Sequence, residues 1–336
     1  MNRPKVFHAA IGALCALFLS AAVPPASAGQ APAGRPAATG CALKPGRTTL
    51  TIDSGGTQRT VLVHVPPKQV GRGHLPMVLN LHGSQSTALW QLGLSQLEAT
   101  ADSKGFLLVA PQGGIVAEPG YRWNVPYVTG TGGPDDERFL TDTIDTLTRS
   151  GCADPARVYA TGYSGGARMV SQYACDHPGR VAAIATVAGL RAGAPVQDAD
   201  GAYVPDPATC RPDRPVPVLS FSGTADPVNP HAGGGPAYWG YGAVTAQRQW
   251  AALNRCRLGP RMVDVTEHVS RVTYSACRRG ADVVMYVIDG GGHTWPGTTV
   301  PLPPDLGPVT DEISANDVMW RFFSAAHRPP ARPELP

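Results

Sequence analysis

RVYATGYSGGARM, residues 157–169, places a short apolar run directly before Gly162-Tyr163-Ser164-Gly165-Gly166 and a helical pattern directly after it. A serine on a sharp turn between a strand and a helix is a nucleophile elbow, in which small flanking residues let backbones approach closely. The hydroxyl then stands at the strand end, near a helix N-terminus whose dipole favours developing negative charge. The stretch predicts Ser164 as a nucleophile; the alternative is a structural glycine-rich turn.

Similar apolar runs alternate with helical patterns along the chain. The runs are Met77–Leu81, Phe106–Ala110, Val158–Thr161, Ala182–Val187, Val218–Ser222 and Val283–Ile288, and the helical patterns cover 89–104, 136–150, 165–176 and 244–254. Short Val/Ile/Leu runs without alternation are typical of parallel strands covered on both faces. Thr48–Ile52 and Arg59–Val65 alternate instead, which indicates a hairpin. A final helix is expected near Ser314, where Asp317 completes a capping pattern.

These patterns predict an α/β fold with a mostly parallel, doubly wound sheet and an antiparallel N-terminal hairpin. The chain has 336 residues, of which 43% are hydrophobic and 16% charged, so it is globular. We expect one catalytic domain over 46–326, preceded by a flexible lead-in at 29–45 and followed by a tail at 327–336. The formal charge is +3 without a Lys/Arg block, so no nucleic-acid partner is expected.

A serine nucleophile needs a base, and in this kind of fold the acid and the base follow the serine in that order. Asp226 lies in the loop after the predicted strand Val218–Ser222, and His293 lies in the loop after Val283–Ile288. We therefore predict Asp226 as the orienting acid and His293 as the base. The alternatives are Asp289, the aspartates of a proline-rich stretch (Asp198, Asp200, Asp206 and Asp213), and the histidines His231, His268 and His327.

The oxyanion of such a reaction needs preorganised N–H donors. One comes from the residue after the nucleophile, here Gly165. The other is expected from the loop Leu81-His82-Gly83-Ser84, at the amide of Ser84 or of Gln85. His82 is interpreted as a histidine that braces this loop.

The N-terminus is typical of a secretory signal. Arg3 and Lys5 precede an apolar run of about 14 residues, shorter than the roughly 20 that a membrane-spanning helix needs. Ala26-Ser27-Ala28 provides a small-residue cleavage site. We expect residues 1–28 to be removed and the protein to be secreted, with no membrane contact afterwards; an uncleaved anchor is the alternative.

Six cysteines remain after the signal, and an even count in an exported chain indicates disulfides, for which six cysteines allow 15 pairings. The six are Cys41, Cys152, Cys175, Cys210, Cys256 and Cys277. No cysteine or histidine spacing is typical of a zinc site. We expect neither a metal nor another cofactor.

Several motifs together resemble one known family. They are LHGS (81–84), RWN (122–124), DDERFL (135–140), RVYATGYSGGARM (157–169), SGTADPVNP (222–230) and GGGHTWPG (290–297). Over residues 45–325 the chain resembles the secreted poly(3-hydroxybutyrate) depolymerase and feruloyl esterase group of α/β-hydrolases. The resemblance implies an α/β-hydrolase fold without a large lid domain, and a triad of Ser164, Asp226 and His293.

The resemblance also bears on two details. The family often has Ala, Asn or Ser after the nucleophile where this chain has Gly165; since that residue contributes a backbone N–H, we expect no effect on mechanism. The family further implies a Cys256–Cys277 disulfide. Cys175–Cys210 is the next pair considered, and Cys41–Cys152 is the pair that remains.

Several aromatic residues are candidates for the substrate pocket, although core packing is the alternative for each of them. Trp295, two residues after the predicted base, is expected to wall the pocket, as are Tyr163 and Trp123. Trp90 is a candidate for the same role. Trp239 and Tyr241 lie in a glycine-rich loop and are candidates for a cover.

The expected function is that of a secreted, monomeric serine carboxylic-ester hydrolase acting on 3-hydroxyalkanoate oligomers or polymer. A feruloyl or acetylxylan esterase acting on plant polysaccharide is the alternative. A peptidase and a non-enzymatic binding protein are further alternatives, which short segments between motifs and an intact triad disfavour. The sequence contains no polymer-binding module, which favours soluble oligomers or small esters.

Overall fold

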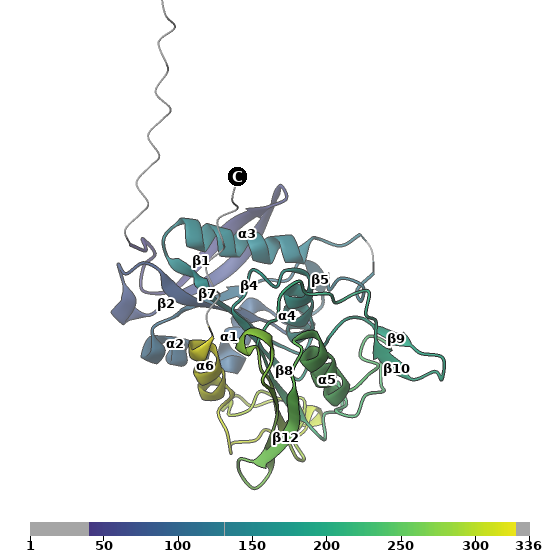
Figure 1. The fold of residues 1–336 in the computed structure, drawn as a ribbon. Helices are drawn as coiled ribbons and strands as arrows, with labels where there is room; N and C mark the ends of the chain where they lie inside the picture. Colours follow the sequence, from purple (N-terminus) through teal and green to yellow (C-terminus); the bar gives the residue numbers. More distant parts are fainter. Residues whose placement is uncertain (1–39, 131, 327–336) are drawn as a thin grey trace, which may run out of the picture. The chain divides into compact units, whose positions relative to one another are not determined.

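A ten-stranded sheet forms the centre of the fold (Figure 1). The computed structural model describes residues 40–130 and 132–326. The predicted signal peptide, the tail and most of the lead-in lie outside these residues. The strand order is β1-β2-β4-β3-β7-β8-β11-β14-β13-β12.

The strands of this sheet are bounded as follows: β1 Gly46–Ser54, β2 Thr57–Val65, β3 Leu75–Leu81, β4 Leu107–Pro111, β7 Ala153–Tyr163, β8 Ala183–Val187, β11 Val218–Gly223, β12 Leu258–Asp264, β13 Val269–Ser275 and β14 Val283–Ile288. The run from β4 to β14 is parallel. At one edge β1 and β2 form the predicted hairpin, and β2 pairs antiparallel with β4. The prediction of a mostly parallel sheet with an antiparallel N-terminal hairpin is confirmed.

Two further strands, β12 and β13, extend the other edge as an antiparallel hairpin that the sequence analysis did not predict. The residues of β12 are exposed apart from Val263, so this edge strand carries no apolar periodicity. Two small ribbons complete the strands: β5 (Ile115–Ala117) with β6 (Gly120–Arg122), and β9 (Pro195–Gln197) with β10 (Tyr203–Pro205).

Helices cover both faces of the sheet (Figure 1). They are α1 Ala88–Ser95, α2 Leu97–Lys104, α3 Asp136–Arg149, α4 Gly165–Asp176, α5 Ala243–Leu253 and α6 Ala315–Ala325, with short 3-10 turns at Pro67–Gln69, Arg278–Gly280 and Pro304–Leu306. The core residues of α3, α4 and α5 cluster with alternate strand residues such as Met77 and Leu79. Those of α1, α2 and α6 cluster with the intervening residues, such as Val78. This alternation explains why the central strands are apolar throughout.

The prediction of one helix over 89–104 is wrong, because the chain breaks there into α1 and α2. Gln96 adopts a left-handed conformation with φ 53° and ψ 25°. Its side-chain amide donates to Thr299 Oγ1 at 2.9 Å, and its amide oxygen accepts from the Thr299 N–H at 3.1 Å. The break is therefore held by a segment that lies far away in the sequence. The final helix does begin as predicted, since Ser314 Oγ accepts from the Asp317 N–H.

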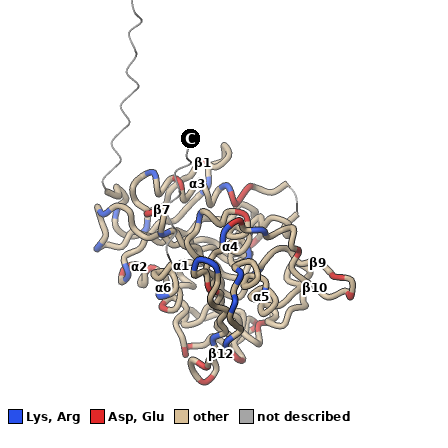
Figure 2. Tube along the Cα trace, viewed as in Figure 1, with Lys and Arg blue, Asp and Glu red and all other residues tan. Residues whose placement is uncertain are grey.

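Three disulfides connect the domain: Cys41–Cys152, Cys175–Cys210 and Cys256–Cys277. These are the pairings considered in the sequence analysis, and they fit an oxidising compartment. Lys and Arg are interspersed with Asp and Glu along the trace (Figure 2). Within the described residues, the helices are too short or too polar to cross a membrane.

Removal of the long-range disulfide should destabilise the protein more than removal of the short-range one. Loop entropy predicts a loss of about 5 kcal/mol for Cys41→Ala/Cys152→Ala, whose sequence separation is 111, and about 3 kcal/mol for Cys256→Ala/Cys277→Ala, whose separation is 21. Urea unfolding of the two double variants measures both losses. An equal or larger loss for the short loop would contradict the entropic account.

Candidate active site

Ser164 lies at the junction of β7 and α4 in a conformation that is rare for a residue with a side chain. Its φ is 52° and its ψ is −112°. The Ser164 N–H donates to the carbonyl of Val187 on β8 at 2.9 Å, and the Ser164 carbonyl accepts from the Arg168 N–H at 3.1 Å. Backbone contacts on both sides of the residue therefore hold the strained turn.

The glycines of the motif are required by close backbone packing. A Cβ on Gly162 would lie 2.5 Å from the carbonyl carbon of Gly166, and a Cβ on Gly166 would lie 2.3 Å from the carbonyl oxygen of Leu81. Real Cβ atoms do not approach so closely. Because these two positions carry no side chain, the turn can be sharp and can pass directly over the end of β3, as the elbow interpretation requires.

His293 and Asp226 form a buried hydrogen-bonded pair. His293 Nδ1 lies 2.8 Å from Asp226 Oδ2, and both side chains are almost fully buried. The other carboxylate oxygen accepts the N–H groups of Val228 and Asn229, each at 2.8 Å. With Nδ1 donating to the carboxylate, Nε2 of a neutral His293 is left as the basic nitrogen.

Tyr163 supports the histidine from the residue next to the serine. Its hydroxyl donates to the His293 carbonyl at 2.6 Å, and the centroids of the Tyr163 and His293 rings lie 5.0 Å apart. Burial, and secondarily the nearby negative charge of Asp226, raise the pKa of Tyr163 above its ordinary value, so the phenol remains a donor at neutral pH. Parallel strands end at one edge of the sheet, and the loops after β7, β11 and β14 bring the three predicted residues together there.

Ser164 and His293 face the same pocket, which has a volume of about 750 Å³. Among residues 40–130 and 132–326, no group hydrogen-bonds to the Ser164 hydroxyl. Contacts between nucleophile and base are often loose in substrate-free sites and tighten when substrate binds.

The two predicted oxyanion donors, Gly165 and Ser84, lie side by side in the wall of this pocket. A Cβ on Gly165 would lie 2.3 Å from Ser84 Oγ and 3.0 Å from Ser84 N. The Ser84 hydroxyl thus occupies the space that a side chain at position 165 would need. A residue larger than glycine at position 165 would therefore require a shift of Ser84, a dependence that the sequence alone did not indicate.

His82 braces the loop that carries Ser84. Its Nδ1 lies 2.7 Å from the Gly83 carbonyl, and its Nε2 accepts the Gly113 N–H at 2.9 Å. Trp123 Nε1 donates to the His82 carbonyl at 2.8 Å. Burial lowers the pKa of His82 to about 4, so the ring is neutral and its Nε2 can accept. These contacts agree with the interpretation of His82 as a structural residue.

The other predicted pocket residues divide into two groups. Tyr163, Trp123 and Trp90 line the pocket. Trp295 does not: it is 1% exposed in the core and donates through Nε1 to Asn316 at 3.1 Å, because the chain turns inward after His293. Trp239 and Tyr241 are likewise buried, and they are therefore not a cover.

The alternative acids and bases lie outside the site wherever the structure describes them. Asp289 accepts a hydrogen bond from Thr224, and His231 is bound to Ser222. His268 pairs with Glu312 at the surface. His327 lies outside the described residues. In the described part of the chain, no three His, Cys, Asp or Glu side chains are grouped as a metal ion would require.

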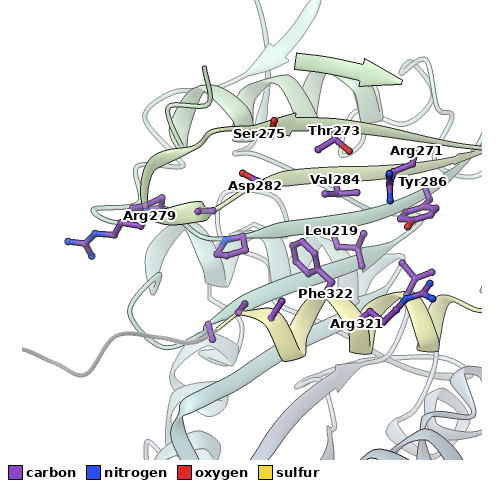
Figure 3. A pocket seen from close by; sticks show the side chains of 18 of the residues that line it. Leu219, Arg271, Thr273, Ser275, Arg279, Asp282, Val284, Tyr286, Arg321 and Phe322 are labelled. Atoms are coloured by element: carbon purple, nitrogen blue, oxygen red, sulfur yellow. The ribbon is translucent and has the colours of Figure 1, made fainter. Parts of the chain in front are cut away.

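A second and larger groove, of about 910 Å³, contains none of the three predicted catalytic residues. Its lining includes Leu219 and Val284 from the sheet and Phe322 and Arg321 from α6 (Figure 3). Phe322 is only half-buried there. The smaller pocket is the candidate active site, because it holds the nucleophile and the base.

The residues that the structure adds to this pocket beyond those predicted include Arg122, Arg168 and Tyr238. Arg168 could have been found, because it lies in the first turn of the predicted helix that begins directly after Ser164, and so close to the serine in space. Tyr238 could not, since its loop has no periodicity that places it.

The fold and the pocket together define an α/β-hydrolase. The acetyl xylan esterase from Aspergillus awamori superposes with a TM-score of 0.56 at 17% identity, over 82% of this chain and 99% of that one, a likeness of fold. No protein-family model matches the chain.

Curated relatives identify the family. "Putative esterase NocK" from Nocardia uniformis subsp. tsuyamanensis is 32% identical over 271 residues, or 74% of each chain. "Feruloyl esterase B" from Piromyces equi is 31% identical over 70% of this chain and 42% of its own length. "Poly(3-hydroxyalkanoate) depolymerase C" from Paucimonas lemoignei is 30% identical over 38% of this chain and 30% of its own length. The chain belongs to the family of carboxylic-ester hydrolases that includes feruloyl esterases and poly(3-hydroxybutyrate) depolymerases.

Acid should destabilise the fold through His82. Its pKa is lowered from 6.5 to about 4, so between these pH values the unfolded chain binds a proton that the folded chain does not. The free energy of unfolding should therefore fall by about 3 kcal/mol from this residue as the pH drops from 6.5 to 4. Urea unfolding at a series of pH values should show a shallower decline for His82→Gln than for the wild type. Identical slopes would contradict this prediction.

Proposed function

We propose that the protein hydrolyses carboxylic esters, with Ser164 as nucleophile, His293 as general base and acid, and Asp226 as the residue that orients the histidine. One observation carries the proposal. A strained serine at a strand–helix junction shares a pocket with a histidine that is buried and hydrogen-bonded to a carboxylate at 2.8 Å. That constellation activates an otherwise weak nucleophile.

The reaction proceeds in two halves. Ser164 Oγ attacks the ester carbonyl carbon while His293 Nε2 takes the hydroxyl proton, and the carbonyl oxygen becomes an oxyanion that the amides of Gly165 and Ser84 stabilise. The C–O bond to the alcohol breaks as His293 returns the proton to it. Water, deprotonated by His293, then attacks the acyl-enzyme, and the acid and free Ser164 result.

Asp226 supports these steps without being protonated itself. It holds His293 with Nδ1 protonated and stabilises the imidazolium that forms in each half-reaction. Its second oxygen is already held by two backbone N–H groups, which fixes the position of the carboxylate. The Tyr163 hydroxyl holds the histidine backbone by donating to its carbonyl.

The proposed substrates are oligomers or polymers of 3-hydroxyalkanoates. The depolymerase among the relatives supports this class. Feruloyl or acetyl esters on plant polysaccharide are the second candidate, which the more extensive match to a feruloyl esterase favours. We further propose that residues 1–28 direct secretion and are then removed; the three disulfides support an extracellular location.

Ser164→Ala should abolish esterase activity without unfolding the protein. Because the attacking oxygen is lost, kcat on p-nitrophenyl butyrate should fall by about 10³-fold or more. Ser103→Ala removes an exposed hydroxyl on α2 and is the matched control. Undiminished hydrolysis by Ser164→Ala would remove this serine from the mechanism. Absence of hydrolysis by the wild type as well would favour a binding protein.

Asp226→Asn should lower kcat strongly while KM changes little. The amide can donate to His293 and so favours the tautomer with a protonated Nε2, which cannot accept the serine proton. Steady-state kinetics on the same ester measure both constants. Asp289→Asn, at the nearby surface, is the matched control, and an equal loss in that variant would show that Asp226 has no special role.

A panel of substrates distinguishes the two substrate classes. Hydroxybutyrate oligomers, methyl ferulate and acetylated xylan should be compared by kcat/KM. A preference for the oligomers supports the first class, and a preference for methyl ferulate or acetylated xylan supports the second.

A further inference from the structure

The charged side chains in the wall of the active-site pocket are cationic. Arg122 and Arg168 line it beside Ser164 and His293, and its described lining contains neither aspartate nor glutamate. Asp226 lies behind the histidine, where its oxygens are already occupied. The pocket thus offers a substrate positive charge without a fixed negative partner.

Arg168 is the more constrained of the two arginines. It lies one helical turn after Ser164, and its guanidinium lies 4.3 Å from the ring centroid of Tyr238. Nη2 makes a long hydrogen bond of 3.3 Å to Ser84 Oγ. Nε and Nη1 are shielded from solvent and have no hydrogen-bond partner of ordinary geometry in the described structure, although the Tyr238 side chain favours the charged form of Arg168.

Such a group is costly to bury. Buried charges are normally paired or fully hydrogen-bonded, since desolvation is unfavourable. Burial lowers the pKa of Arg168, yet a guanidinium stays protonated at any physiological pH. Within the described residues, Arg168 has no carboxylate partner. Nη2, which lies beside Ser84 in the pocket wall, is the nitrogen at which an anion supplied by the substrate would provide one.

The buried Arg191 adds positive charge close to Arg168. The Arg191 guanidinium packs 3.4 Å from the ring centroid of Tyr241 and 4.7 Å from that of Trp239. Burial, and to a smaller extent the positive charge of Arg168, lower the pKa of Arg191 to about 10, so the two guanidinium groups are close enough to repel. Arg191 is also without a carboxylate partner in the described part of the chain.

We propose that Arg168, assisted by Arg122, binds a free carboxylate of the substrate and thereby selects esters that carry one. A guanidinium presents a planar fork that matches a carboxylate. Arg168 contacts Ser84, the proposed oxyanion residue. A carboxylate bound to Arg168 would therefore lie close to the carbonyl group of the ester that is cleaved. The inference rests on the proposed function and refines its substrate class.

The substrate class that fits is a short 3-hydroxy acid oligomer with a free acid end. In a dimer, the leaving alcohol is itself a 3-hydroxy acid, so its carboxylate lies close to the ester that is cleaved. A long polymer offers such a group only at its terminus, and methyl ferulate offers none. The pocket charge therefore favours soluble oligomers over both.

The competing explanation is that Arg168 only positions Ser84. In that case its loss would slow the hydrolysis of every ester by a similar factor. A carboxylate-binding role instead predicts a loss confined to carboxylate-bearing substrates and expressed mainly in KM. The ratio of kcat/KM between a charged and an uncharged version of one substrate separates the two roles.

The test compares the 3-hydroxybutyrate dimer with its methyl ester, following cleavage of the internal ester by chromatography. The wild type should prefer the free acid by about 10-fold or more, since hydrogen bonds to charged groups contribute of that order. Arg168→Gln should remove most of this preference, Arg168→Lys should retain part of it, and Arg122→Gln should reduce it. Arg248→Gln removes an exposed arginine on α5 and is the matched control, in which the preference should persist.

Hydrolysis of p-nitrophenyl butyrate tests the esterase function separately from the carboxylate subsite. If the wild type cleaves this ester but does not prefer the free-acid dimer, the carboxylate subsite is refuted and the esterase function stands. A loss of equal size on both dimers in Arg168→Gln also refutes it. If Arg168→Gln does not fold, the exposed Arg122 still tests the subsite. An unchanged preference of Arg122→Gln for the free-acid dimer would then show that Arg122 does not bind the carboxylate. A wild type that cleaves no ester overturns the proposed function and this inference together.

Discussion

The hydrogen bond between His293 and Asp226 is the interaction on which the rest of the site depends. It joins the loop after β14 to the loop after β11, two segments that lie 67 residues apart in the sequence. Burying a carboxylate is tolerated here because both of its oxygens are satisfied, one by the imidazole and the other by two backbone N–H groups. The same bond leaves Nε2 of His293 available as a base toward the pocket.

The strained turn at Ser164 is the second constraint. A positive φ at a serine persists only where its surroundings hold it, and here the contacts come from β8 and the first turn of α4. The turn also brings Gly166 against the end of β3, and this places Gly165 beside Ser84. Nucleophile and proposed oxyanion donors are thus positioned by one backbone geometry.

Buried polar groups around the pocket differ in how well they are satisfied. Asp226 and His82 have partners for their buried polar atoms, whereas Arg168 has two nitrogens without any in the described structure. Ser86 Oγ in the same pocket wall also lacks a partner in the described structure, but Arg168 carries a charge, and for this reason we assign its partner to the substrate. The stability of the scaffold and the proposed selectivity of the site therefore rest on different residues: the first on the disulfides and the braced loops, the second on the cations of the pocket wall.

The sequence by itself determined the parallel sheet, the elbow and the positions of the three candidate residues, because these depend on local patterns and on chain order. Apolar runs mark central strands, and Asp226 and His293 follow such runs directly. Tertiary structure alone decided the break at Gln96, which Thr299 holds, and the inward course of Trp295. It also decided the charge of the pocket, since Arg122 and Arg168 come from separate elements. Which side chains lack partners depends on contacts between distant segments, and a local sequence pattern does not contain that information.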